Sequence, residues 1–175
     1  MNRKLTRAGV LLALTFIFQS LRMIVPLPAF LSTILIGSLV NACLLIGAET
    51  IGWWPALTIA VAAPIVAYFQ QALPFPVLIA PIAAGNAIYI SLYLFIRPQS
   101  RWPPNRRAGR WPAIGLAAAG KAFFLYEAFR WLLAFIAVPA KIAAALMAVM
   151  SWPQFITAVS GGIIALFIAK RLKKI

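Results

Sequence analysis

The chain alternates between long apolar stretches and short breaks marked by proline, glycine or tryptophan. An α-helix crosses a bilayer with about 20 apolar residues, and six stretches meet this rule. The expected spans are residues 5–25, 30–51, 55–73, 76–96, 113–138 and 152–169. The pattern therefore predicts an all-α, polytopic membrane protein with six transmembrane helices, forming a single integral membrane domain over residues 1–175.

Two segments of this pattern have more than one interpretation. The stretch "AKIAAALMAVMSW" before the sixth span is either a short interfacial helix or an early start of that span. The N-terminal "MNRKLTR" and the apolar run after it are similar to a signal peptide. However, the run continues through Gln19 to Arg22 without a small-residue cleavage site. We therefore expect this segment to be retained as the first helix.

The basic residues predict how the helices are oriented. Twelve of them lie before span one, between spans four and five, or after span six: Arg3, Lys4, Arg7, Arg97, Arg101, Arg106, Arg107, Arg110, Lys170, Arg171, Lys173 and Lys174. The opposite loops contain only Lys141. Because basic loops stay in the cytoplasm, both termini are expected to be cytoplasmic. The same clustering at span ends accounts for the net charge of +14 without a nucleic-acid partner.

The composition excludes most catalytic chemistry. The chain is 64% hydrophobic, has no histidine, and has only two acidic side chains, those of Glu49 and Glu127. Acid–base catalysis, metal ligation and catalytic triads depend on residue types that are scarce or missing here. We therefore expect no enzyme activity, no metal site and no cofactor. Glu49 lies at the cytoplasmic end of span two, where we expect it to be solvated, and Cys43 has no second cysteine to pair with.

The segment from Gly115 to Lys121 matches the phosphate-binding pattern G-x-x-x-x-G-K, but we do not interpret it as a nucleotide site. The residue after Lys121 is Ala122, which has no hydroxyl to bind Mg²⁺, and the segment lies in a continuous helical pattern without a preceding strand. Lys121 is instead an ionisable group deep in a buried helix, which needs a polar partner. It points away from Glu127 on an ideal helix, so we expect it to contact a neighbouring helix.

Polar residues recur at helical spacing in several spans. The stripes are Thr15, Gln19 and Arg22 in span one, Asn86, Tyr89 and Tyr93 in span four, Glu127 and Arg130 in span five, and Gln154, Thr157 and Ser160 in span six. Most of these residues fall in the expected extracellular half, and polar groups in lipid must face each other, water or a ligand. A solute pocket open to the outside meets this requirement. The expected substrate-binding residues are Gln19, Arg22, Asn86, Tyr89, Lys121, Glu127, Arg130 and Gln154.

Each of these residues also has a structural interpretation. Arg22 and Arg130 lie near span ends, from which their side chains can reach the head groups. Glu127 and Arg130 can form a structural ion pair, and Asn86 and the span-six residues can form interhelical hydrogen bonds. For the solute itself, the excess of basic groups favours an anion or a zwitterion, and the aromatic residues favour a ring.

Small residues at i, i+4 spacing indicate close helix contacts. Gly9 and Ala13 form such a pair in span one, Ala63 and Ala67 form another in span three, and Gly161 and Gly162 are adjacent in span six. Such residues allow helix backbones to touch. Two roles remain open for them, packing within the chain and docking to another membrane subunit.

The chain resembles the substrate-binding S components of energy-coupling-factor (ECF) transporters. The resemblance lies in the short six-span layout and in the stretches "FLSTILIGSLVNACLLIGA", "LPFPVLIAPIAAGNAIYI", "GKAFFLYEAF" and "WPQFITAVSGGIIALFIAKRLKK". It implies an ATP-driven importer of a prokaryotic cell membrane, in which this subunit captures a vitamin or similar micronutrient on the extracellular side. It also implies three partners, a membrane T component and two cytoplasmic ATPase subunits. The T component would contact Gly9 and Ala13.

Two other functions fit the sequence less well. A stand-alone carrier driven by protons or sodium needs a titratable or anionic site within the membrane, and Glu127 is the only suitable residue. In a non-transport membrane assembly protein, the polar stripes would serve packing alone.

Overall fold

The computed structural model describes residues 3–26, 28–98 and 109–172. Within them the elements are α1 (Arg3–Ile24), α2 (Ala29–Thr50), α3 (Trp53–Phe69), the 3-10 helix η1 (Pro76–Leu78), α4 (Ile79–Ile96), α5 (Arg110–Phe135), α6 (Ala140–Val149) and α7 (Trp152–Leu172). The all-α prediction is confirmed. Five of the basic residues used to predict orientation lie outside the described residues, namely Arg101, Arg106, Arg107, Lys173 and Lys174.

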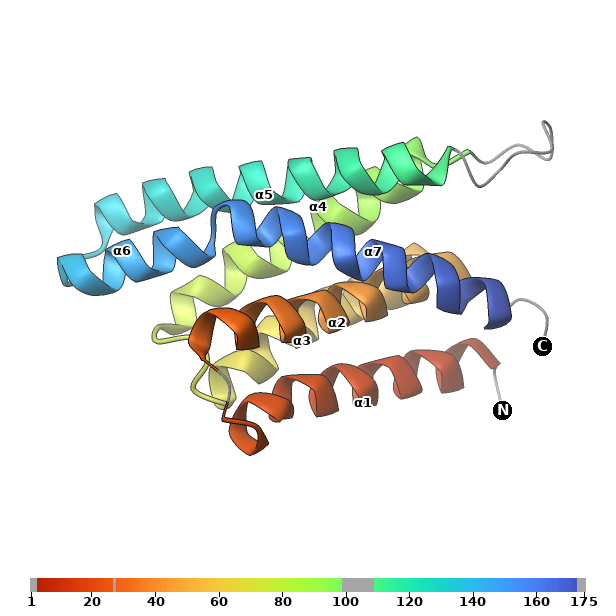
Figure 1. The fold of residues 1–175 in the computed structure, drawn as a ribbon, viewed down its shortest axis with the longest axis horizontal. Helices are drawn as coiled ribbons and strands as arrows, with labels where there is room; N and C mark the ends of the chain where they lie inside the picture. Colours follow the sequence, from red (N-terminus) through yellow and green to blue (C-terminus); the bar gives the residue numbers. More distant parts are fainter. Residues whose placement is uncertain (1–2, 27, 99–108, 173–175) are drawn as a thin grey trace.

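The long helices run alternately up and down one bundle (Figure 1). The start of α1 and the end of α7 lie at the same end of the bundle, which we call the terminal end. The turn between α1 and α2, the turn between α3 and η1, and the helix α6 lie at the opposite end, which we call the far end. The segment before the sixth expected span is a separate helix, because α6 ends at Val149 and α7 begins at Trp152.

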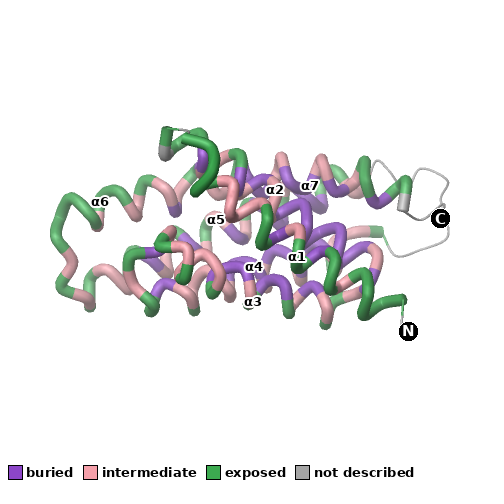
Figure 2. The backbone as a smooth tube through the Cα atoms, turned by 90° about the horizontal axis from the view of Figure 1, so that it is seen from below, coloured by how far each residue is buried: buried purple, intermediate pink, exposed green. Residues whose placement is uncertain are grey.

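Helix α2 is the centre of the bundle. It packs against α1, α3, α4 and α7, and every residue from Asn41 to Ala48 is buried, as is Glu49. Its sequence is apolar on all sides, as expected for a helix that neighbours surround. The main apolar core therefore lies between the second half of α2, the first halves of α3 and α5, the second half of α4, and α7. Figure 2 shows buried segments gathered in the body of the bundle, whereas α6 has none.

The outer surface of the bundle is apolar. Large side chains such as those of Phe16, Phe69, Phe95 and Phe167 are exposed on different helices. In water this much exposed apolar surface would be unfavourable, whereas lipid accommodates it. Four segments are long and apolar enough to cross a membrane: Arg3–Ile24, Phe30–Thr50, Pro76–Ile96 and Ala140–Arg171. The chain is therefore a helical membrane protein with four candidate spans.

Two further long helices lie outside this set of four. Helix α3 is apolar but has only 17 residues. Helix α5 has 26 residues, and they include Lys121, Glu127 and Arg130. Lys121 and Glu127 lie well inside α5, whereas the charged residues of α1, α2 and α7 lie toward the helix ends.

A close contact between α2 and α7 depends on Gly161. A Cβ atom added at Gly161 would lie 2.5 Å from the carbonyl oxygen of Ser38 and 2.8 Å from the amide nitrogen of Ala42. Both atoms belong to the backbone of α2, so they cannot move aside as a flexible side chain can. The expected close approach at Gly161 is confirmed, and it brings α7 directly against the central helix.

We predict that Gly161→Ala destabilises the fold, by about 1–3 kcal/mol as is typical of overpacking. Gly115→Ala is the matched control, because a Cβ at Gly115 meets no atom within 4 Å and alanine favours a helix. Unfolding can be followed by circular dichroism and by the reaction of a thiol dye with Cys43, the chain's only cysteine, which is buried. A Gly161→Ala protein that melts at or above the temperature of Gly115→Ala would contradict this account of the α2–α7 contact.

Candidate functional site

A cavity of about 780 Å³ lies in the far half of the bundle. Its walls come from the last turns of α1 and α3, the first halves of α2 and α4, the middle of α5, the whole length of α6 and the start of α7. Apart from the middle of α5, these parts lie toward the far end of the bundle (Figure 1). The volume is in the range of pockets that enclose small organic molecules, about 300–1,000 Å³.

Five of the eight predicted substrate-binding residues line this cavity. They are Gln19, Arg22, Asn86, Lys121 and Gln154. They come from four different helices. Polar residues that were predicted to lie at a similar depth in the membrane therefore do converge on one cavity for these five positions. Their role in binding a solute remains a prediction.

Tyr89 lies outside the cavity lining. It is fully buried, and its hydroxyl donates a hydrogen bond to the carbonyl oxygen of Ala158 at 2.5 Å. The Nζ atom of Lys121 lies 5.5 Å from the centre of its ring. The ring of Tyr89 therefore packs near the Lys121 ammonium group, and its hydroxyl connects α4 to α7 by a hydrogen bond.

Glu127 and Arg130 also lie outside the cavity lining. Their side chains form an ion pair at 2.9 Å within α5 and are 30% and 57% exposed. The guanidinium of Arg130 lies 6.0 Å from the ring of Trp131. The structure thus shows the ion pair that the sequence left open as the alternative, on a surface of α5 that does not form the cavity.

Lys121 is the centre of the polar network at the cavity. Its side chain is buried, with the whole residue 3% exposed, and its Nζ donates to Oδ1 of Asn41 at 2.6 Å and to Oδ1 of Asn86 at 2.8 Å. The expectation that Lys121 contacts neighbouring helices is confirmed. The segment Gly115–Lys121 lies inside the continuous helix α5, so it does not form the loop that a phosphate site requires.

The two asparagine amide groups that accept hydrogen bonds from Lys121 are themselves fixed by further hydrogen bonds. Asn86 Nδ2 donates to the carbonyl oxygen of Ala60 at 3.2 Å, and Asn41 Nδ2 donates to Oγ1 of Thr157 at 3.3 Å. Both asparagines therefore turn their oxygen atoms toward the ammonium group. The network joins α2, α3, α4, α5 and α7 at one level, which fixes the position of Lys121 at the floor of the cavity.

Several cavity residues were missed by the sequence reasoning, namely Asn41, Gln70, Gln71 and Lys141. Asn41 interrupts the apolar run "GSLVNACLL", and this isolated amide was a usable signal. Gln70 and Gln71 lie just after α3, in a turn where Gln71 has a φ of 57°. Lys141 was counted only as a loop charge, because nothing in the sequence showed that α6 folds back over the other helices.

Two polar atoms on the cavity wall have no hydrogen-bond partner among the described residues. They are Oε1 of Gln19 and Oγ of Ser32. Gln19 is anchored by its other amide atom, since Nε2 donates to the carbonyl oxygen of Ala63 at 2.8 Å. A buried polar atom without a partner costs about 1–3 kcal/mol. A molecule in the cavity, water included, can supply the missing partner.

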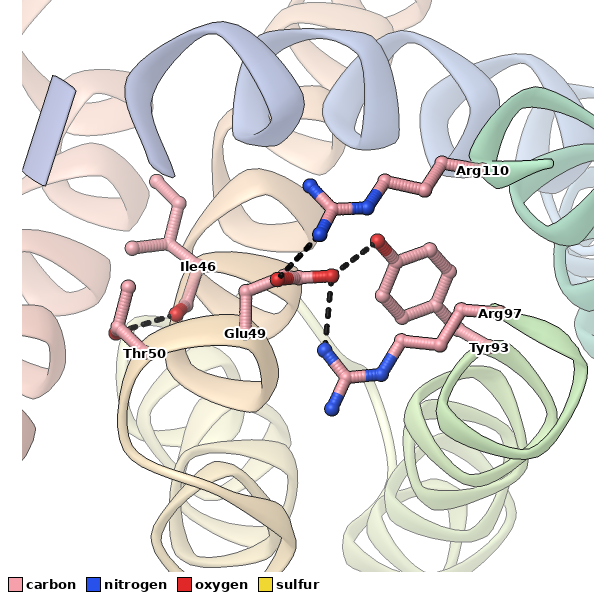
Figure 3. Close-up of polar contacts among 6 residues, drawn as sticks. All are labelled: Ile46, Glu49, Thr50, Tyr93, Arg97 and Arg110. Atoms are coloured by element: carbon pink, nitrogen blue, oxygen red, sulfur yellow. Dashed lines mark hydrogen bonds and ion pairs between the residues drawn. The ribbon is translucent and has the colours of Figure 1, made fainter. Parts of the chain in front are cut away.

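The expectation that Glu49 is solvated is wrong. Its side chain is 1% exposed and accepts hydrogen bonds from the Tyr93 hydroxyl at 2.6 Å and from Arg97 at 2.9 Å, with Arg110 at 3.7 Å (Figure 3). The arginines at the end of α4 and at the start of α5 lie over the end of α2, so a position near a helix end is still enclosed. Arg97 and Arg110, two of the basic residues used to predict orientation, neutralise the Glu49 carboxylate.

The two ends of the bundle are therefore built differently. At the terminal end the Glu49 carboxylate joins three helices in a compact ionic cluster, with Nε of Arg97 as a buried donor without a partner among the described residues. At the far end the helices separate around the cavity. The cavity therefore lies toward the far end, while charge pairing holds the helices together at the terminal end.

No known protein family, curated protein or solved structure matches the chain. The fold and the site together define it as a helical integral membrane protein with four candidate spans and a polar cavity at one end.

We predict that Glu49→Gln destabilises the protein by about 1–3 kcal/mol, because Arg97 and Arg110 lose their buried anionic partner. The matched control is Glu127→Gln, which removes the chain's other carboxylate from a partly exposed pair and should cost about 1 kcal/mol or less. Melting of both variants and the wild type in the same detergent measures the difference. Equal melting temperatures for the two variants would show that the Glu49 cluster does not stabilise the terminal end.

Proposed function

We propose that the chain is a substrate-binding membrane subunit of the ECF type, which captures a small solute on the extracellular side. The observation that carries this proposal is the cavity of about 780 Å³ whose floor is the buried Lys121–Asn41–Asn86 network. A membrane protein whose polar residues served only packing would pair them without leaving such a space. The resemblance of the chain to S components supplies the rest of the proposal.

The proposed topology has six membrane passes with both termini in the cytoplasm. The antiparallel course of the six long helices supports it, since it places the start of α1 and the end of α7 at one end (Figure 1). Basic residues at this end, such as Arg7, Arg97 and Lys170, favour the cytoplasmic side. The cavity then faces outward, as capture of an extracellular solute requires. The location that follows is the cell membrane of a prokaryote.

The proposed partners are a membrane T component and two cytoplasmic ATPase subunits. Such partners would supply ATP hydrolysis, for which Lys121 is unsuited because it is held in the middle of α5. The proposed contact with the T component is at Gly9 and Ala13. Both residues are exposed, and both line a groove of about 470 Å³ between α1 and α3. Small residues on an exposed apolar groove allow another helix to approach closely.

The contacts of the two acids argue against an ion-coupled carrier. Glu49 is enclosed by two arginines at the terminal end, and Glu127 pairs with Arg130 outside the cavity. Neither carboxylate lines the cavity, so no acidic side chain is placed to bind a coupling ion next to a solute. Solute uptake by vesicles that contain this chain and no ATPase would support the carrier instead.

We predict that Ala145→Trp abolishes or greatly weakens solute capture, by about tenfold or more, because the indole fills part of the cavity. Ala145 lines the cavity from α6, whereas the adjacent Ala144 is exposed and does not. Ala144→Trp is therefore the matched control on the same helix. Mass spectrometry of the small molecules that co-purify with each variant, without added ATP, measures the effect. Equal recovery of a solute from both variants would place its site elsewhere, and no solute from the wild type would count against the proposed function.

We also predict that the double variant Gly9→Leu, Ala13→Leu retains solute binding but loses ATP-driven uptake. A Cβ at Gly9 meets no atom within 4 Å, and Gly9 and Ala13 are both exposed, so we expect the two leucines to fill the groove while the fold is kept. The control is Val10→Leu, an exposed position on α1 outside the groove. Uptake is measured in cells that supply the T component and ATPases, and binding on the purified chain. Normal uptake by the double variant would exclude this groove as the docking site.

A further inference from the structure

We infer that the captured solute is an aliphatic carboxylate whose acidic group binds Lys121 at the floor of the cavity. This inference rests on the proposed function, because it assigns a substrate class to the same cavity. It follows from the charge, the hydrogen-bond geometry and the wall composition of the site.

The first argument is the balance of charge. The chain has two acidic side chains, and each is already occupied by arginine: Glu49 by Arg97 and Arg110, and Glu127 by Arg130. Lys121 is buried in the middle of the helix bundle with amide oxygens as its only hydrogen-bond acceptors among the described residues. Amide dipoles solvate an ammonium ion but do not neutralise it. A carboxylate that enters the cavity supplies the missing countercharge where the low dielectric makes the attraction strong.

The second argument is the number of donors at Lys121. A lysine ammonium has three N–H donors, and two of them donate to Asn41 and Asn86. One donor remains for a solute, which suits a single carboxylate oxygen better than a phosphate, whose dianion needs several donors. Each asparagine turns its amide oxygen toward Lys121 and donates an N–H elsewhere, Asn41 to Thr157 and Asn86 to Ala60.

The third argument is the rest of the cavity wall. The charged residues that line it are Arg22, Lys121 and Lys141, and no acidic residue does so. Arg22 and Lys141 are exposed, where they attract anions toward the cavity. The lining contains no aromatic side chain, so the ring that the sequence favoured has no stacking partner here. Its apolar part is aliphatic apart from the thioether of Met150, and its uncharged polar groups are the hydroxyls of Ser32 and Thr33 and the amides of asparagine and glutamine side chains.

The test compares two probes that differ only in charge, 6-acetamidohexanoate and its neutral amide, 6-acetamidohexanamide. Both are titrated against the detergent-solubilised full chain after bound solutes have been removed by dialysis. The carboxylate is expected to bind about tenfold or more tightly than the amide, because its bond to Lys121 is charge-assisted. Lys121→Gln keeps a hydrogen-bond donor but removes the charge, so it should abolish the preference for the carboxylate over the amide.

The outcomes separate this inference from the proposed function. Equal binding of the two probes, or binding of neither, overturns the carboxylate assignment. A carboxylate preference that survives in Lys121→Gln also overturns it, because the charge would then act elsewhere. If Lys121→Gln does not fold, the two probes on the wild type still decide. The proposed function is tested separately by the solute that co-purifies with Ala144→Trp and is lost from Ala145→Trp, whatever its charge.

Discussion

The structure depends on how a buried ammonium group is solvated in the middle of a helix bundle. Lys121 lies 11 residues after Arg110, the first residue of α5, which corresponds to about 16 Å along the helix. At that depth an isolated charge costs several kcal/mol. Oxygen atoms of Asn41 on α2 and Asn86 on α4 offset this cost. Helices α2, α4 and α5 must therefore meet at the level of Lys121. From that level toward the far end, they separate around the cavity.

At the terminal end of the bundle, a buried charge is stabilised in another way. Glu49 is buried beside two arginines and a tyrosine hydroxyl, so its charge is neutralised within the chain (Figure 3). Lys121 has no such partner. The Glu49 carboxylate thus stabilises the terminal end. The Lys121 ammonium group is the one that, in our proposal, binds an external anion. Because the chain has only two acidic side chains, their pairing with arginines leaves Lys121 as a buried cation of the cavity without an acidic partner.

The sequence predicted the helices well because apolar length and helix breakers act locally. It also predicted the direction of Lys121, since the angle between two positions on one helix is fixed. It did not predict which polar stripes face inward. Glu127 shares its depth with Gln19, yet only Gln19 lines the cavity, because depth is set along one helix and facing is set by its neighbours. The prediction for Glu49 failed for the same reason, since the arginines at the end of α4 and at the start of α5 cover it. Asn41 was an isolated polar residue outside any stripe.

The cavity wall differs in rigidity from one side to the other. On the floor, Gly161 brings α7 into backbone contact with α2 and leaves no room for adjustment. On the outer side, α6 contributes cavity residues from Lys141 to Val149 but contains no buried residue, and it packs mainly against α5 and α7. An element with few buried contacts moves at the lowest cost in free energy. In the proposed function, entry of a solute would require least rearrangement at α6, while the Lys121 network would stay fixed. A rigid floor preserves the position of the charge, and a loosely held wall gives access to it.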